Sequence, residues 1–164
     1  MRAEFEKAIE FLHSIGIVIS FEPMEEDGFL PGLAIKNGTI IVDRDKLKYP
    51  GDIIHEAGHI AVVPANERPM LNEGNIETRQ DRDAEEMMAI AWSYAVCVHL
   101  QIDPYFVFHD HGYKGTGKPI ADHFKKRQYF GVSMLQYAGM TKDITRNNVG
   151  EKIIYPQMEK WMRE

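Results

Sequence analysis

The segment HEAGH at positions 55–59 constrains the fold of this chain more than any other feature. On an α-helix, residues i and i+4 lie on the same face, so the imidazoles of His55 and His59 can point at one ion. This geometry requires a helix across the segment. Pro50 stands where a helix can begin, and Pro64 stands where it must end. We therefore expect one amphipathic helix between these two prolines.

The chemistry of this segment depends on the acid between the two histidines. Glu56 lies on the same turn and can reach a water molecule in the open position of a zinc ion without binding the ion itself. Zinc lowers the pKa of such a water towards roughly 7, and a carboxylate can then accept its proton. This spacing is the one used in metal-assisted hydrolysis of a carbonyl group. We expect a Zn²⁺ site in which Glu56 is the general base.

A catalytic zinc site needs a third protein ligand besides the two imidazoles. A metzincin would carry glycine at position 62 and histidine at position 65, but Val62 and Ala65 stand there, so that class is excluded. The remaining candidates are acidic residues downstream: Glu67, Glu73, Glu77, Asp81, Asp83, Glu85 and Glu86. A ligand on a second helix packed against the first is the most rigid arrangement, which favours the pair Glu85 and Glu86.

The choice within this pair stays open on periodicity. Glu86 lies on the helical face of Ala89 and Ser93, whose small side chains would let two helices approach closely enough to share a metal. Arg82, at i−4, could equally pair with a solvated Glu86. The helix is apolar all round after this point, so periodicity is weak evidence. We favour Glu86 and retain Glu85 as the alternative.

The rest of the chain indicates an α+β fold. Apolar runs at residues 33–35 and 39–42 flank Asn37-Gly38, which is a strong signal for a tight hairpin because both turn positions need positive φ. Further expected elements are a helix at 3–14, a strand at 17–21, a loop at 65–77, a long buried helix at 78–100, a short helix near 103 and weaker helices at 120–138 and 155–163. We predict a small zincin-like domain over residues 1–164, with a short antiparallel sheet packed on the HExxH helix and the long helix.

Composition narrows the functional classes. The 164 residues are 44% hydrophobic, enough for one core, and the formal charge of −6 without a basic stripe argues against nucleic acid. The single cysteine, Cys97, allows no internal disulfide and fits a reducing compartment. The longest apolar stretch, residues 87–98, is too short to span a bilayer, and the first residues lack an apolar signal core. We expect a cytoplasmic protein without a membrane partner.

The loop at residues 109–119 offers the remaining candidates for chemistry. Peptide hydrolysis needs a donor that steadies the oxyanion, and His109, His111 and Tyr113 lie on this glycine-containing loop. Functional residues often occupy loops held by rigid helices. We take His109 and Tyr113 as candidate catalytic residues; a solvated polar loop is the alternative.

The chain resembles the small gluzincins, especially the ImmA/IrrE-type peptidases. The resemblance covers roughly residues 33–95, and includes the strand Thr39–Val42, the HEAGH helix and the later helix. The family's E-x-x-A-x-x-F/W pattern, which supplies its glutamate ligand, is matched by Glu86, Ala89 and Trp92. The chain departs from the usual Ala-Asn pair with Ile90, and it carries no recognisable helix-turn-helix.

These observations predict a zinc-dependent hydrolase, most simply a metallopeptidase. His55, His59 and Glu86 would hold the metal, and the substrate would be a peptide or protein segment that could add as a strand along the edge of Thr39–Val42. The alternative is a non-catalytic module in which zinc fastens two helices and the surface binds a partner protein. Glu56 favours catalysis, because a purely structural site has no use for a free carboxylate beside the ion. The sequence does not indicate the oligomeric state.

Overall fold

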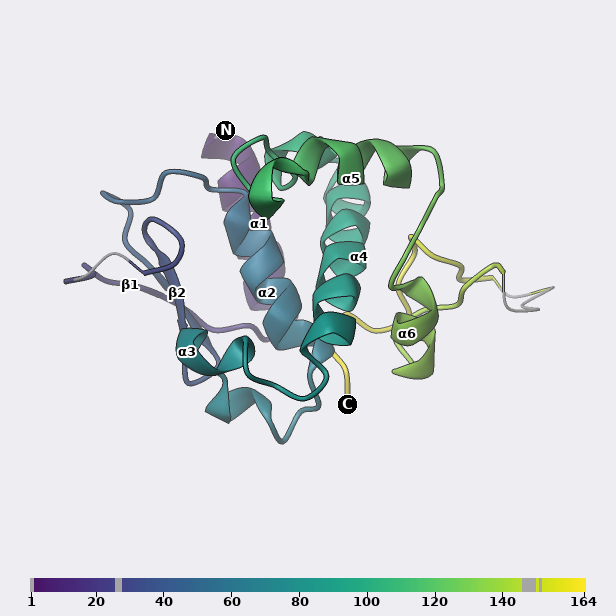
Figure 1. Ribbon diagram of the computed structural model, residues 1–164, viewed down its shortest axis with the longest axis horizontal. Helices are drawn as coiled ribbons and strands as arrows, with labels where there is room; N and C mark the ends of the chain where they lie inside the picture. The colour runs from purple at the N-terminus through teal and green to yellow at the C-terminus, as the bar shows by residue number, and fades with distance from the viewer. Residues whose placement is uncertain (1, 26–27, 146–149, 151) are drawn as a thin grey trace.

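A small sheet lies to one side of a group of helices in the computed structural model of the protein (Figure 1), which describes residues 2–25, 28–145, 150 and 152–164. The α-helices are α1 (Arg2–Ser14), α2 (Asp52–Val62), α3 (Glu73–Ile76), α4 (Arg82–Leu100), α5 (Gly117–Lys125) and α6 (Val132–Tyr137). The strands are β1 (Ile19–Phe21), β2 (Leu33–Lys36) and β3 (Thr39–Val42). Short 3₁₀ turns lie at Arg68–Met70, Pro104–Phe106 and Tyr113–Gly115. The expected α+β class is confirmed.

The centre of the molecule is the antiparallel pair of α2 and α4 (Figure 1). A Cβ atom added to Gly58 would lie 3.0 Å from the Ala89 carbonyl oxygen, so the two backbones approach closely at this point. One turn away, the Ser93 hydroxyl donates to the carbonyl of Ala89 at 2.7 Å and lies 3.5 Å from the Ile54 carbonyl oxygen. The expected close packing at small residues is therefore present, and it places the first turn of α4 beside the last turns of α2.

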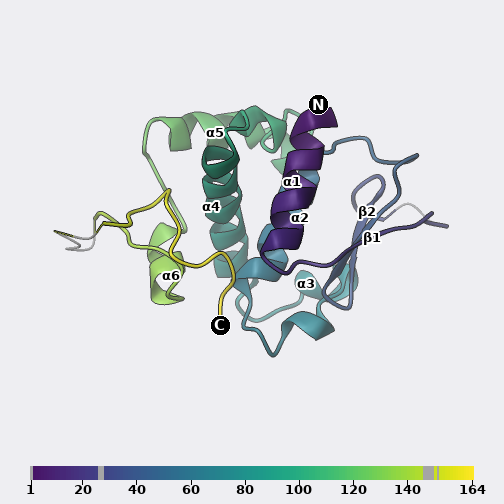
Figure 2. The same ribbon diagram turned by 180° about the vertical axis from the view of Figure 1, so that it is seen from behind.

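Helix α1 lies against α2 on the side away from α5, as the view from behind shows (Figure 2). Helix α4 is buried along most of its length, and the Trp92 side chain is fully enclosed. The indole N–H of Trp92 donates to the carbonyl of Trp161 at 2.9 Å, so the C-terminal segment crosses this helix as turns and extended chain and not as the expected helix at 155–163. Despite the apolar character of α4, no helix among the described residues is long and apolar enough to cross a membrane.

The sheet corrects one structural expectation. Its order is β1-β3-β2, with β3 antiparallel to β2 and parallel to β1. The sheet is therefore mixed and not purely antiparallel. Because β3 is paired on both sides, no edge is free along Thr39–Val42, and the hypothesis that a substrate adds as a strand there is wrong.

The turn between β2 and β3 follows directly from its two residues. Asn37 has a φ of 50° and Gly38 a φ of 71°, the positive values that a tight hairpin of this kind needs. A Cβ atom on Gly38 would lie 2.4 Å from the carbonyl oxygen of Arg68, so glycine is also required for space. The predicted hairpin is confirmed.

Several helix boundaries differ from the sequence expectation. The segment 65–77, expected to be a loop, contains a 3₁₀ turn and α3, and the long helix begins at Arg82 and not near residue 78. The pattern at 120–138 is divided into α5 and α6, because Arg127 and Gly131 adopt positive φ between them. These differences arise where the periodicity was weakest.

We predict that Gly58→Val lowers the free energy of unfolding by about 1–3 kcal/mol, because the added methyl groups meet the backbone of Ala89 and force α2 and α4 apart. Urea unfolding of the metal-free protein measures this change. Gly74→Val is the matched control, since a Cβ atom on Gly74 meets nothing within 4 Å. Equal effects of the two substitutions would contradict the close packing of the two helices.

Candidate metal centre

Three side chains from α2 and α4 converge at the contact between the helices. The Nε2 atoms of His55 and His59 lie 3.1 Å apart. One carboxylate oxygen of Glu86 lies 3.6 Å from Nε2 of His55, and the other lies 3.3 Å from Nε2 of His59. The one-turn spacing of the histidines and the antiparallel approach of α4 together bring two ring nitrogens and a carboxylate to one place.

The spacing of these atoms suits a zinc ion. Two atoms that each lie about 2.0–2.2 Å from a tetrahedral zinc ion are roughly 3.3–3.6 Å apart. The distances between the three groups, from 3.1 to 3.6 Å, fall close to this range. The donor set of two imidazoles and one carboxylate also matches the ligands that zinc takes in catalytic sites. The residues therefore fit zinc in both distance and chemistry.

The electrostatics of the three groups favour a cation between them. Burial lowers the pKa of His55 to about 4 and the pKa of His59 to about 3, so both rings are neutral at pH 7. Neutral imidazole is the form that binds a metal. With both rings uncharged, neither offers a positive charge to the Glu86 carboxylate, and a divalent cation would supply one.

Glu56 projects from the same turn of α2. Ligand atoms of His55, Glu56 and His59 lie within 4.8 Å of one another, and no hydrogen bond to the Glu56 carboxylate occurs in the part of the chain that the structure describes. Burial raises the pKa of Glu56 to about 8, and the negative charges of Asp52 and Glu86 add to this rise. A divalent cation nearby would lower that pKa again, because it stabilises the carboxylate. A metal ion bound to the two histidines would thus set the basicity of Glu56.

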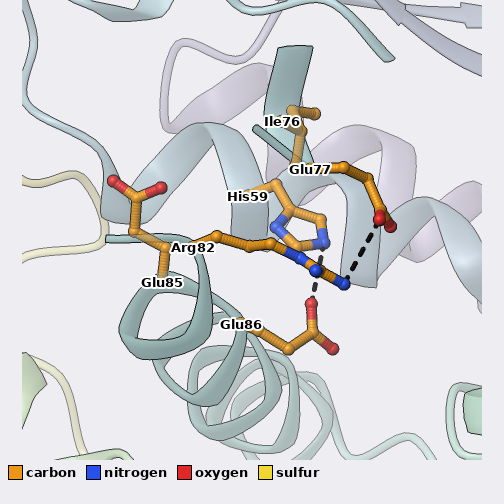
Figure 3. A pocket seen from close by; sticks show the side chains of 6 residues that line it. All are labelled: His59, Ile76, Glu77, Arg82, Glu85 and Glu86. Atoms are coloured by element: carbon orange, nitrogen blue, oxygen red, sulfur yellow. Dashed lines mark ion pairs between the residues drawn. The ribbon is translucent and has the colours of Figure 1, made fainter. Parts of the chain in front are cut away.

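Glu85 has a different partner, which separates it from Glu86. Arg79 donates from Nε and from an outer guanidinium nitrogen to the two oxygens of the buried Glu85 carboxylate, at 2.7 and 2.8 Å. The same guanidinium also donates to Glu67 at 2.6 Å. In Figure 3 the Glu85 side chain points away from His59, whereas that of Glu86 points towards it. Of the two candidates, the structure places only Glu86 beside the histidines.

Tyr113 lies on the His55 side of the centre. Its ring meets the His55 ring edge to face, with 5.0 Å between the centroids. The Tyr113 hydroxyl is buried and has no hydrogen-bond partner among the described residues. Burial and the nearby carboxylates of Glu86 and Asp52 raise the pKa of Tyr113 well above its usual value, which keeps the phenol protonated. A donor without an acceptor is thus held next to the candidate metal ligands.

His109, from the loop before Tyr113, contacts Asp52 at the N-terminal end of α2. Its Nε2 atom is 2.8 Å from a carboxylate oxygen of Asp52, and Tyr49 stacks on its ring at 4.4 Å. The opposite ring nitrogen of His109 is buried without a partner. Burial raises the pKa of Asp52, and the contact with His109 opposes that rise. Sequence reasoning missed Asp52, although its position three residues before His55 places it on the same helical face.

The structure therefore brings together five of the six residues singled out from the sequence: His55, Glu56, His59, Glu86 and Tyr113. The sixth, His109, contacts Asp52, and no contact between His109 and the candidate metal ligands is seen among the described residues. Comparison of the chain with protein families, with curated proteins and with solved structures finds no match. What the centre can do must therefore follow from its own residues.

We predict unequal stability effects for the two neighbouring glutamates in the metal-free protein. Glu85→Ala should cost about 2–3 kcal/mol, because it leaves the partly buried Arg79 without its main partner. Glu86→Ala should change the free energy of unfolding by less than about 0.5 kcal/mol, because its side chain is 40% exposed. Urea unfolding with a chelator present measures both. Comparable losses in the two variants would contradict the assignment of a structural role to Glu85 and not to Glu86.

Proposed function

We propose that the protein is a zinc-dependent hydrolase, and most specifically a metallopeptidase. The observation that carries this proposal is the convergence of two neutral imidazoles and the Glu86 carboxylate beside Glu56, which has no hydrogen-bond partner in the described part of the chain. In this proposal His55, His59 and Glu86 hold the ion. Zinc at such a site polarises a substrate carbonyl and lowers the pKa of water to roughly 7.

Glu56 then handles the protons of the reaction. Its carboxylate accepts a proton from the attacking water and delivers it to the amine that leaves when the peptide bond breaks. The buried position strengthens this role, because desolvation makes the carboxylate more basic than an exposed glutamate. The ion offsets part of that effect, so Glu56 can be ionised near neutral pH.

Tyr113 is the donor that we assign to the developing oxyanion. Its hydroxyl is buried and without a partner next to His55, so no other group competes for its proton. A donor fixed in place before the reaction stabilises charge that appears only in the transition state. Asp52 accepts a hydrogen bond from His109, and this contact orients His109 at the N-terminal end of α2. His109 thus supports the loop that carries Tyr113.

Two features favour this activity over a non-catalytic zinc module. A structural zinc site is closed by four protein ligands, whereas three protein ligands leave a position open. The Glu86 side chain is 40% exposed, so a substrate can approach the centre from that side. No hydrogen bond or ion pair within the described residues explains the burial of Glu56 beside the histidines. The gluzincin resemblance and a cytoplasmic location stay predictions, and the lone buried Cys97 agrees with the latter.

We predict that the purified protein carries one zinc ion per chain, and that His55→Ala, His59→Ala and Glu86→Ala each lose most of it. Each substitution removes one of three ligands, and a zinc ion with two protein ligands dissociates easily. Elemental analysis after dialysis against a weak chelator gives the metal content.

Glu85→Ala is the matched control for this measurement. It removes the neighbouring carboxylate, which contacts Arg79 and not the histidines, so the folded variant should keep its zinc. Full zinc content in Glu86→Ala would show that the third ligand is wrongly assigned. No zinc in the wild-type protein, even after incubation with the metal, would refute the site itself.

We predict that Glu56→Gln keeps full zinc content and lowers kcat for peptide hydrolysis by about 10²–10⁴-fold, the typical contribution of a general base. Glutamine has the same size but accepts no proton. Cleavage of a mixture of unstructured peptides by the zinc-loaded protein, followed by mass spectrometry, measures the activity. A wild-type protein that binds zinc yet cleaves no peptide would favour the non-catalytic module.

A further inference from the structure

A cavity of about 50 Å³ opens beside the candidate zinc ligands (Figure 3). It is lined by His59, Ile76, Glu77, Arg82, Glu85 and Glu86. One water molecule needs roughly 10–15 Å³, so the cavity holds a small polar group and not a large side chain. Because His59 and Glu86 form one wall, a group bound there belongs to the substrate residue next to the cleaved bond.

Arg82 is the arginine of the cavity lining, and its guanidinium has N–H donors without an acceptor among the described residues. Arg79, which contacts Glu85 of the cavity wall, is held by hydrogen bonds to Glu85 and Glu67. Arg82 makes one ion pair, with Glu77 at 3.2 Å, and no hydrogen bond from its guanidinium is seen among the described residues. A guanidinium carries five donors in a planar fork that matches a carboxylate.

The ion pair between Arg82 and Glu77 is easily displaced. Their side chains are 47% and 65% exposed, and exposed pairs of this kind contribute little to stability. In Figure 3 the Arg82 side chain extends from the first turn of α4 towards Glu77 along the cavity that His59 and Glu86 also line. An incoming carboxylate could therefore replace or join Glu77 at small cost.

The charges around the cavity would be close to balanced once zinc is present. Arg79 pairs with Glu85 and Glu67, and Arg82 pairs with Glu77. Zinc would carry two positive charges, and the carboxylates of Glu86 and of an ionised Glu56 would cancel them. Selection of an anion therefore rests on Arg82 itself, whose guanidinium lines the cavity. A lysine of the substrate placed there would lie beside this guanidinium, which Coulomb repulsion opposes.

We propose that Arg82 selects substrates that carry a carboxylate on the residue next to the cleaved bond. Two sources supply this group: the side chain of Asp or Glu, and the free C-terminus of a peptide. The inference rests on the proposed peptidase activity and adds a substrate class to it. Arg82 acts here as a specificity-determining residue and takes no part in the proton transfers.

Binding without cleavage provides the first test. The zinc-loaded Glu56→Gln protein is titrated with fluorescently labelled peptides that differ only in Asp, Asn or Lys next to the bond that the wild type cleaves. We expect the Asp peptide to bind about tenfold tighter than the Asn peptide, as a charge-assisted hydrogen bond allows, and the Lys peptide to bind most weakly. Adding Arg82→Gln should reduce the Asp peptide to the level of the Asn peptide.

Arg44→Gln is the matched control. Its guanidinium is 50% exposed and forms an ion pair with Glu6 at the same 3.2 Å, away from the cavity. This variant should keep the preference for Asp. Glu77→Gln should strengthen binding of the Asp peptide a few-fold, because it frees Arg82. Peptides with free and amidated C-termini distinguish the two sources of the carboxylate.

The outcomes separate this inference from the proposed function. Equal binding of Asp and Asn peptides, or an equal loss for both in Arg82→Gln, would overturn the role of Arg82 while leaving the peptidase intact. A wild-type protein that holds zinc but binds and cleaves none of the peptides would overturn both. The preference should also shrink in 0.5 M salt, since ions screen a partly exposed guanidinium, and a salt-independent preference would count against Arg82 as its source.

Discussion

The close contact between α2 and α4 is the constraint on which the candidate site depends. Glu86 reaches the two histidines only because Gly58 lets the Ala89 backbone approach to contact distance. A larger residue at position 58 would push the first turn of α4 outwards. The arrangement of the candidate ligands thus depends on helix packing as much as on the ligands themselves. The short HEAGH segment contains both the two histidines and the glycine that permits the packing.

Burial gives the same centre its electrostatic character. Enclosing His55 and His59 lowers their pKa values, and enclosing Glu56 raises its pKa, because a low-dielectric surrounding disfavours every charged form. The result is a pair of neutral imidazoles beside a protonated acid, and a divalent cation bound to the imidazoles would favour ionisation of that acid. Glu85 on α4 is also buried, but it accepts two hydrogen bonds from Arg79. The two buried glutamates thus differ, because Glu85 has a cationic partner and Glu56 has none among the described residues.

Features that depend on adjacent residues could be predicted from the sequence, whereas features that depend on contacts between distant residues could not. Asn37-Gly38 determines its turn through its own backbone preferences, and the α2 helix is bounded by prolines, so both could be predicted. The choice of Glu86 over Glu85 depends on the rotation of α4 against α2 and on Arg79, which lies outside the helix. Periodicity in a helix that is apolar all round contains neither piece of information.

Longer-range pairings were harder to foresee for the same reason. The parallel pairing of β1 with β3 makes β3 an internal strand, and nothing within Thr39–Val42 encodes which strands lie on either side. The contact between Asp52 and His109 spans 57 residues of sequence. Only the three-residue spacing of Asp52 from His55 hinted at a shared face. Such contacts depend on the tertiary packing of the whole chain, so no short stretch of the sequence predicts them.

The site has two unlike sides, and this asymmetry bears on how a substrate would lie. On the His55 side, Tyr113 is buried, so that side suits a reacting carbonyl group from which water must be excluded. On the His59 side, Glu86 and Arg82 remain partly exposed beside a small polar cavity. Groups that stabilise a transient charge are best preorganised away from solvent, whereas groups that recognise a substrate must first be reached through it. A peptide bound across both sides would thus be recognised on the exposed His59 side and cleaved on the buried His55 side.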